Sequence, residues 1–202
     1  MCGRYFVDRA ESPEDLERII DALNRKGQIV KTGEIFPGDT VPVIANTKAL
    51  TPAPFAIPWG YKMPDGKLII NARSETAAEK PMFQDGMAQR RCLLLATNYF
   101  EWEKRSGTKI KYAIRPTVDG VMYMAGLYRI EGNKVRCTIL TRQPAENISF
   151  IHDRMPVLLP KEMVRDWLNP KYDAMDIIKN AVTDVMFAPV EGAQQLQLGE
   201  LR

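Results

Sequence analysis

RCLLLATNYFEW, residues 91–102, joins a strongly apolar run to a single carboxylate that lies between large aromatic side chains. The apolar run Leu93–Ala96 predicts a β-strand. Glu101 follows it, between Phe100 and Trp102. Such surroundings disfavour the charged carboxylate and raise its pKa, which suits a general acid near neutral pH. Strand alternation equally permits the reverse arrangement, with Glu101 in solvent and both aromatic side chains in the core.

Turn residues separate further predicted strands on both sides of this stretch. Asp119-Gly120 and Glu131-Gly132-Asn133 divide the strands that follow it, a pattern that indicates antiparallel hairpins. Pro42 suggests that the strand containing it lies at a sheet edge, because proline cannot donate a ladder hydrogen bond. The predicted strands cover residues 3–7, 41–45, 55–61, 67–70, 93–96, 109–114, 121–128, 135–140 and 155–159.

Three helices are predicted, the first of them from its start signal. Ser12 suits the N-cap, Pro13 suits the first helical position, and acidic residues follow in the first turn. Apolar residues then recur at helical spacing until Gly27, which can stop the helix. The other two helices are predicted over residues 160–168 and 172–182.

The composition is that of an ordinary globular chain. Its 202 residues are 45% apolar and 26% charged, and the net charge is +3. We expect a single domain over residues 1–202. The mild positive charge is compatible with a nucleic-acid partner. No run approaches the ~20 apolar residues of a membrane span, and charged residues at positions 4, 8 and 9 interrupt the region where a secretory signal would have its apolar core. We therefore expect a cytoplasmic protein without a membrane partner.

The three cysteines are an odd number without short spacing, which indicates free thiols in a reducing compartment. Cys2, Cys92, Cys137 and His152 could arithmetically form a zinc site. However, the chain contains no Cys-x-x-Cys knuckle. We therefore expect neither a metal nor a cofactor.

The amino terminus, Met1-Cys2-Gly3-Arg4-Tyr5, offers a chemical device. Cysteine at position 2 is small enough for Met1 to be trimmed, which would leave an α-amine and a thiol on neighbouring carbons of Cys2. The amine can form a Schiff base with an aldehyde, and the thiol can then close on the imine carbon to give a thiazolidine. Because both nucleophiles belong to one residue, the second step is intramolecular. A cysteine at this position could equally occur by chance.

Two other polar segments are candidates for a site. Asn71–Thr76 has no apolar period and follows a predicted strand, where sites are often placed. It could equally be a capped turn into a helix near residues 76–80. The only histidine, His152, precedes the last predicted strand. A lone histidine is more often structural than catalytic, and Arg154 beside it could bind a phosphate or solvate a loop.

Four stretches together resemble the SRAP (SOS response-associated peptidase) family, which shields abasic sites in single-stranded DNA. The resemblance runs from residue 1 to about residue 160, and the set of four is far more specific than any one of them. The stretches are Met1–Tyr5; Trp59-Gly60 followed by Asn71–Thr76; Arg91-Cys92 followed by Tyr99–Trp102; and Thr141 followed by His152–Pro156.

The resemblance implies an α+β domain with a barrel-like antiparallel sheet core and flanking helices. It implies a monomer that acts on abasic sites in single-stranded DNA and forms a thiazolidine cross-link through Cys2, with the protein on the nucleoid when DNA is damaged. Asn71, Glu101 and His152 match the family's other active-site residues. Nucleic-acid contacts are implied for Arg4, Arg73, Arg154, Trp59, Trp102, Pro37 and Thr141.

The chain departs from the family pattern at two places. Ala96-Thr97-Asn98 stands where the family more often has a stretch that ends in Asp-Gly, and Phe36 stands where a small residue is usual before Pro37. Both changes can alter the shape of the DNA groove, and neither removes a catalytic group.

Three rival functions remain open from the sequence. The first is a cysteine peptidase with Cys2 as an amino-terminal nucleophile that could also cut its own leader. The second is a non-catalytic single-strand DNA-binding protein in which Cys2 is merely buried. The third is a redox sensor in which Cys2 forms a disulfide with Cys92 or Cys137.

Overall fold

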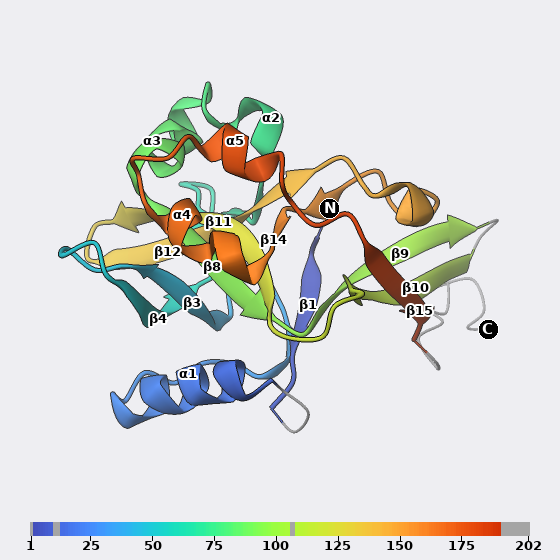
Figure 1. The fold of residues 1–202 in the computed structure, drawn as a ribbon, viewed down its shortest axis with the longest axis horizontal. Helices are drawn as coiled ribbons and strands as arrows, with labels where there is room; N and C mark the ends of the chain where they lie inside the picture. The colour runs from blue at the N-terminus through green and yellow to red at the C-terminus, as the bar shows by residue number, and fades with distance from the viewer. Residues whose placement is uncertain (1, 10–12, 106–107, 191–202) are drawn as a thin grey trace.

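The computed structural model describes residues 2–9, 13–105 and 108–190, and these form an α+β fold of largely antiparallel sheets with short helices around them (Figure 1). The larger sheet has the order β13 (Met155–Pro156), β12 (Lys134–Arg142), β11 (Met122–Glu131), β8 (Arg91–Ala96), β3 (Thr40–Asn46), β4 (Pro52–Pro58), with β14 (Leu158–Leu159) on β11 and β7 (Asn71–Arg73) on β12. The second sheet has the order β15 (Val185–Pro189), β10 (Thr108–Pro116), β9 (Asn98–Arg105), β1 (Arg4–Val7), β2 (Gly33–Ile35). A two-stranded ribbon joins β5 (Tyr61–Lys62) to β6 (Leu68–Ile69).

The α+β class predicted from the resemblance is confirmed, but a closed barrel is not. Each sheet within the described residues is open, with two end strands in its order. The two large sheets meet instead at Thr97, the single residue between β8 of one sheet and β9 of the other. The backbone N–H and the hydroxyl of Thr97 both donate to the Phe6 carbonyl, at 2.8 and 3.0 Å, which ties this crossing point to β1.

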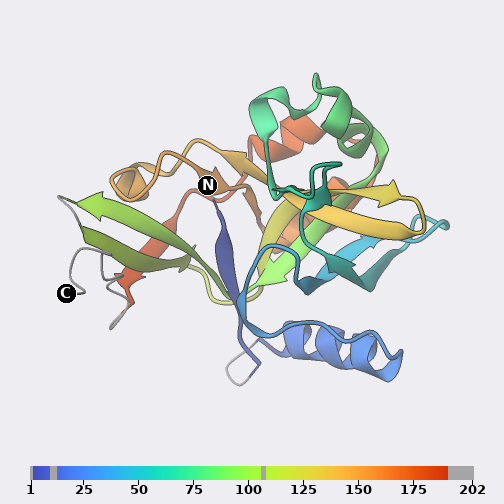
Figure 2. The same ribbon diagram turned by 180° about the vertical axis from the view of Figure 1, so that it is seen from behind.

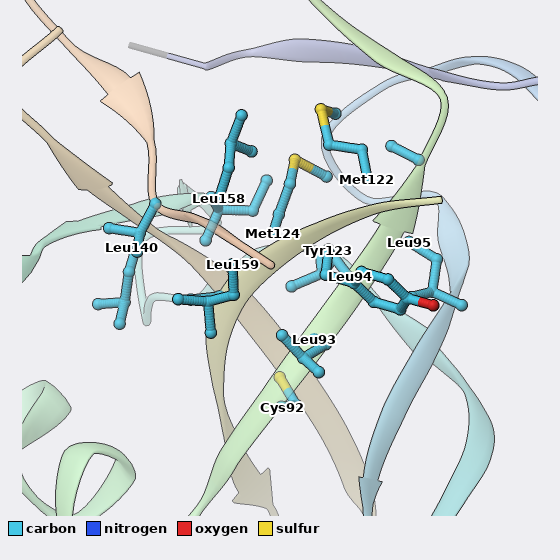
Figure 3. Packing of buried hydrophobic residues seen from close by; sticks show 14 of the residues in the cluster. Cys92, Leu93, Leu94, Leu95, Met122, Tyr123, Met124, Leu140, Leu158 and Leu159 are labelled. Atoms are coloured by element: carbon cyan, nitrogen blue, oxygen red, sulfur yellow. The ribbon is translucent and has the colours of Figure 1, made fainter. Parts of the chain in front are cut away.

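β8 is the centre of the hydrophobic core. All six of its residues are buried: the four of the predicted apolar run Leu93–Ala96, and also Arg91 and Cys92. Leu94 pairs with Met124 of β11 on one side and with Val43 of β3 on the other. Figure 3 shows the side chains of β8 close to those of β11, with Leu140 and the β14 leucines beside them. The larger sheet is thus held together through β8.

The edge position predicted for the strand of Pro42 is wrong. β3 lies between β8 and β4, and β4 is the true end strand. Pro42 is tolerated because the pairing of β3 with β8 covers only Val43–Ala45, so Pro42 faces a partner on the β4 side alone. β4 itself begins and ends with proline and has a third at position 54, which leaves few donors on this edge for pairing with another chain.

The helices are shorter than predicted. α1 (Glu14–Arg25) begins after Pro13 and buries Leu16, Ile20 and Leu23, and Ser12 lies outside the described residues. The remaining segments are α2 (Ser74–Ala77), α3 (Pro81–Gln89), α4 (Val164–Leu168), α5 (Ala174–Ile178) and the 3₁₀ turns η1 (Glu146–Ile148) and η2 (Lys161–Met163). α3, β2, β7 and β15 were not predicted, and the strand predicted over 155–159 is split at Val157 into β13 and β14. None of the helices in the described ranges has the length and apolar character that a membrane crossing requires.

Replacing Leu94 by alanine is expected to lower the free energy of unfolding by about 2–5 kcal/mol, because it opens a cavity in β8, the strand that pairs with both β11 and β3. Leu50→Ala makes the same chemical change at a side chain that is 59% exposed, and its effect should stay within about 0.5 kcal/mol. Urea unfolding of both variants measures the difference. Equal effects would contradict the central place given to β8.

Candidate active site

β1 and β9 bring the amino terminus beside the predicted general acid. They pair antiparallel, with Arg4 opposite Phe100 and Tyr5 opposite Tyr99. Cys2 lies two residues before Arg4, and Glu101 directly follows Phe100, so the pairing directs both toward the same end of the ladder. Figure 2 shows the amino-terminal end of β1 beside β9 on one side and the larger sheet on the other. Segments almost 100 residues apart thus meet at one place.

Asn71 holds this end of the chain from the other sheet. Its side-chain amide donates a hydrogen bond of 2.9 Å to the carbonyl of Cys2. Asn71 begins β7, which runs parallel to β12 with Asn71 opposite Ile139. Its carbonyl Oδ1 is buried and has no hydrogen-bond partner within the described part of the chain. Residues 71–76 form a strand-to-helix junction, in which α2 begins at Ser74 rather than near residue 76.

Glu101 is buried, so the alternative that placed it in solvent is wrong. Only 4% of the residue is exposed, and this burial raises its pKa to about 7, with the charge of Asp153 adding to the rise. His152 Nε2 lies 3.9 Å from Glu101 Oε2. Burial also lowers the pKa of His152, which favours its neutral form near pH 7 although Asp153 opposes that shift. Glu101 can therefore either give or take a proton near neutral pH.

The thiol of Cys2 lies in the same buried surroundings. Cys2 is fully buried in the untrimmed chain, and its Sγ lies 3.9 Å from the Arg4 carbonyl. Burial raises the pKa of the thiol, and the charge of Glu101 raises it further. The thiol is therefore protonated near pH 7, and its proton needs an acceptor when the sulfur reacts. The carboxylate of Glu101 is close enough to influence it electrostatically.

A cleft of about 590 Å³ is lined by His152, while Cys2, Asn71 and Glu101 are not among its lining residues. His152 and Trp102 belong to its wall, and so do two arginines predicted from the sequence. Sequence reasoning missed Lys104, which strand alternation places on the same side of β9 as Trp102. The lining residues are Arg73, Trp102, Lys104 and the segment Ser149–Arg154.

The comparison with protein families gives one match for almost the whole chain. The family model described as SOS response associated peptidase (SRAP) matches residues 1–194. The chain belongs to this family. The abasic site processing protein YoqW of Bacillus subtilis (strain 168) is 31% identical over 221 residues, which cover 97% of this chain and 98% of the relative. YobE of the same bacterium, also named an abasic site processing protein, is 33% identical over 193 residues, with 89% and 87% covered.

Solved structures share the SRAP fold. A protein from Bacteroides thetaiotaomicron has a TM-score of 0.78 at 21% identity and covers 95% of this chain and 93% of its own. A phage-related protein from Bordetella bronchiseptica has a TM-score of 0.74 at 25% identity, with 94% of each chain covered. The arrangement of two open sheets therefore recurs in distant chains.

Two of the implied nucleic-acid contacts are not at the surface of this SRAP chain. Trp59 is fully buried, its indole N–H donates to the Ile70 carbonyl at 3.0 Å, and its ring packs edge-on against Tyr5 at 5.1 Å. Thr141 is 1% exposed, and its hydroxyl donates to the Ala72 carbonyl at 3.4 Å. Neither side chain is accessible in the folded chain, because each satisfies its polar atom inside it.

Arg154 also points inward. Its guanidinium donates to both carboxylate oxygens of Glu75, at 2.9 and 2.8 Å, and to the Thr141 carbonyl at 2.6 Å. It thereby fastens α2 to β12 beside His152. Arg73 and Pro37 are exposed, and Arg4 and Trp102 are half-buried. These four keep side chains that a ligand on the surface can reach.

The alternative uses of the cysteines find no matching geometry. Cys2, Cys92 and Cys137 are all free and buried. In the ranges that the structure describes, no group of three or more His, Cys, Asp or Glu side chains could hold a metal ion. The zinc set Cys2, Cys92, Cys137 and His152 is therefore not assembled here.

Arg154→Ala is expected to lower the free energy of unfolding by about 1–3 kcal/mol, because it leaves Glu75 and a buried carbonyl without their donor. Arg73→Ala removes an exposed arginine from the same cleft wall, and we expect a change within about 0.5 kcal/mol. Urea unfolding compares the two variants. If Arg154→Ala unfolds like the parent chain, its guanidinium is not the internal brace described above.

Proposed function

We propose that this protein recognises abasic sites in single-stranded DNA and cross-links to them through Cys2 after Met1 has been removed. The relatives named abasic site processing proteins support the substrate class. The observation that carries the chemistry is the cluster at the amino terminus, where Asn71 holds the Cys2 backbone and Glu101, with a pKa of about 7, lies beside the thiol. This combination suits imine chemistry on an aldehyde.

The first step is attack by the Cys2 amine. An abasic sugar is mostly a closed hemiacetal, and protonated Glu101 can give its proton to the ring oxygen and take up the proton of the anomeric hydroxyl as the ring opens to the aldehyde. The α-amine has a reference pKa of about 7.7–8.0, so a useful fraction is neutral at pH 7. Its nitrogen adds to the aldehyde carbon and gives a carbinolamine. The Asn71 amide keeps the Cys2 backbone in place, and its Oδ1, which has no hydrogen-bond partner among the described residues, can accept a hydrogen bond from the amine or the sugar.

The second step closes the ring. The carbinolamine loses its hydroxyl as water, with a proton from Glu101, and becomes the protonated imine. The Cys2 sulfur then bonds to the imine carbon, the C=N π-electrons move to nitrogen, and the thiol proton passes to the Glu101 carboxylate, which restores the acid. The sum is amine plus thiol plus aldehyde to thiazolidine and one water. No oxidant or reductant is needed.

The accessible residues around the cleft would bind the strand. Arg4 and Arg73 would contact phosphates, a term that is independent of sequence and weakens with salt. Trp102 and Pro37 would pack against the bases next to the gap left by the missing base. A net charge of +3 suffices for this arrangement because the positive charge needs only to be local.

The rival functions gain less from the geometry. A thiol peptidase needs an activated sulfur, whereas burial and the charge of Glu101 raise the pKa of the Cys2 thiol. A redox sensor needs accessible thiols, and all three cysteines are buried. If the protein only bound DNA, without catalysis, there would be no reason for Glu101, a carboxyl group whose pKa is raised by burial, to lie near Cys2.

Cys2→Ala should abolish the denaturant-resistant adduct with an abasic single-stranded oligonucleotide, because it removes the sulfur that closes the ring. Cys2→Ser keeps the amine and should give at most a reversible imine-type adduct. Denaturing gels with and without borohydride trapping measure both forms. A stable, untrapped adduct of full yield from Cys2→Ser would show that the sulfur does not close the ring.

The rate of adduct formation should depend on pH as a bell with its maximum near pH 7–7.5. It rises with pH as the amine loses its proton, and it falls above the Glu101 pKa of about 7 as the acid loses its own. Glu101→Gln should be slower by about 100-fold and should lose the alkaline limb, because glutamine cannot titrate. Single-turnover rates from pH 5.5 to 9 test this. A persisting alkaline limb in Glu101→Gln would assign that limb to another group.

A further inference from the structure

The outer face of the β2–β1–β9–β10 sheet carries an ion cluster that the chemistry above does not use. The register places Arg4 opposite Phe100, Glu34 opposite Phe6, and Lys111 opposite Trp102. Strand alternation puts these side chains on one face, while Tyr99 and Glu101 point to the other. The cluster is defined here as Arg4, Glu34, Phe36, Phe100, Trp102 and Lys111.

A single oxygen of Glu34 holds both cations of the cluster. Glu34 Oε1 accepts from Arg4 Nη1 at 3.0 Å and from Lys111 Nζ at 2.7 Å. Burial alone would raise the pKa of Glu34, but the hydrogen bonds from Lys111 and Arg4 lower it below its ordinary value. The carboxylate is therefore charged at neutral pH. Side-chain exposure is 30% for Glu34, 34% for Arg4 and 11% for Lys111, so water screens the cluster only in part.

Both cations also lie over aromatic rings. The Arg4 guanidinium carbon is 3.8 Å from the centre of the Phe36 ring and 5.8 Å from that of Trp102. Lys111 Nζ is 3.9 Å from the centre of the Phe100 ring and 5.7 Å from that of Trp102. Phe36 is itself 42% exposed. Phe100 is buried, and Trp102 is half-buried. Cations beside rings that are at least partly accessible, here Phe36 and Trp102, are a pattern by which proteins bind single strands, and the face continues through Trp102 into the cleft.

We propose that Glu34 is a built-in counter-anion on this face, which a DNA phosphate must outcompete for Arg4 and Lys111, and that Lys111 is a second phosphate-binding residue. This rests on the proposed function and deepens it. A carboxylate within hydrogen-bonding distance of both cations repels an incoming phosphate and leaves fewer counterions to release. Intact strands then bind weakly and leave, while abasic strands are kept by the covalent step. Glu34 thereby limits non-covalent binding of any strand, so that retention depends on the covalent step.

The chain offers a matched control for the loss of one negative charge. Glu131 also bridges two cations, since its Oε1 lies 2.7 Å from Arg129 Nε and its Oε2 lies 3.5 Å from Arg136 Nε. It ends β11, and Figures 1 and 2 both show the β11–β12 turn at the opposite end of the molecule from the β9–β10 hairpin. Glu131→Gln therefore changes the net charge by the same amount and breaks a similar carboxylate–two-cation cluster far from the proposed DNA-binding face.

The test is the affinity of the mature protein for an intact single-stranded oligonucleotide, measured by fluorescence anisotropy over a series of salt concentrations. Glu34→Gln should bind about three- to tenfold more tightly at low salt, with a slope of log K against log salt that is steeper by about 0.7. Glu131→Gln should bind like the parent. Lys111→Met should weaken binding and should shrink the gain of Glu34→Gln in the double variant, because the competed cation is gone. Thermal melting establishes that each variant is folded.

Several results would overturn the inference. They are an unchanged or weaker affinity in Glu34→Gln, an equal gain in Glu131→Gln, and no measurable binding of the intact strand by any variant. Adduct yield with an abasic strand is recorded in parallel. If every variant forms the adduct but the expected differences in affinity are not seen, only the role of Glu34 is refuted. If the expected differences in affinity are seen but no variant forms an adduct, the cross-linking function is refuted and the role of Glu34 as counter-anion stands.

Discussion

The hydrogen bond from the Asn71 amide to the Cys2 carbonyl joins the two large sheets at the place where the chemistry is proposed. Cys2 precedes a strand of the five-stranded sheet, and Asn71 begins a strand of the eight-stranded one. The crossing at Thr97, between β8 and β9, makes this meeting possible. This crossing allows Glu101 on β9 and Asn71 on β7, which belong to different sheets, both to lie near Cys2. A chain end, which is ordinarily free to fray, is thus held on two sides.

Burial of Glu101 and Cys2 has two consequences, one that favours the chemistry and one that opposes it. It lifts the pKa of Glu101 to about 7, which makes one carboxyl group useful both as acid and as base. It also raises the pKa of the Cys2 thiol, which makes the sulfur a poor nucleophile by itself. The two effects are compatible if the sulfur reacts only after the amine has captured the aldehyde, because ring closure is then intramolecular. The same environment that weakens a peptidase mechanism therefore suits a cross-link.

The sequence predicted the local features well and the long-range ones poorly. The apolar run of β8 and the helix of Leu16 and Ile20 follow from periodicity, which residues near in sequence determine. The position of Pro42 inside a sheet depends on where the pairing with β8 begins, and no local pattern records that. Trp59 was placed at the surface by resemblance, and Arg154 both by resemblance and as a possible phosphate-binding or loop residue beside His152. Their inward hydrogen bonds come from partners distant in sequence. The resemblance indicated which residues to expect in the site, and the structure shows which of those side chains are exposed at the surface.

The most direct test of the account is the intact mass of the purified protein before and after incubation with an abasic single-stranded oligonucleotide, followed by peptide mapping of the adduct. The account predicts a chain that lacks Met1, an adduct mass equal to protein plus oligonucleotide minus one water, and attachment at Cys2. A chain that retains Met1 and still forms the adduct, or an adduct attached to any other residue, would contradict it.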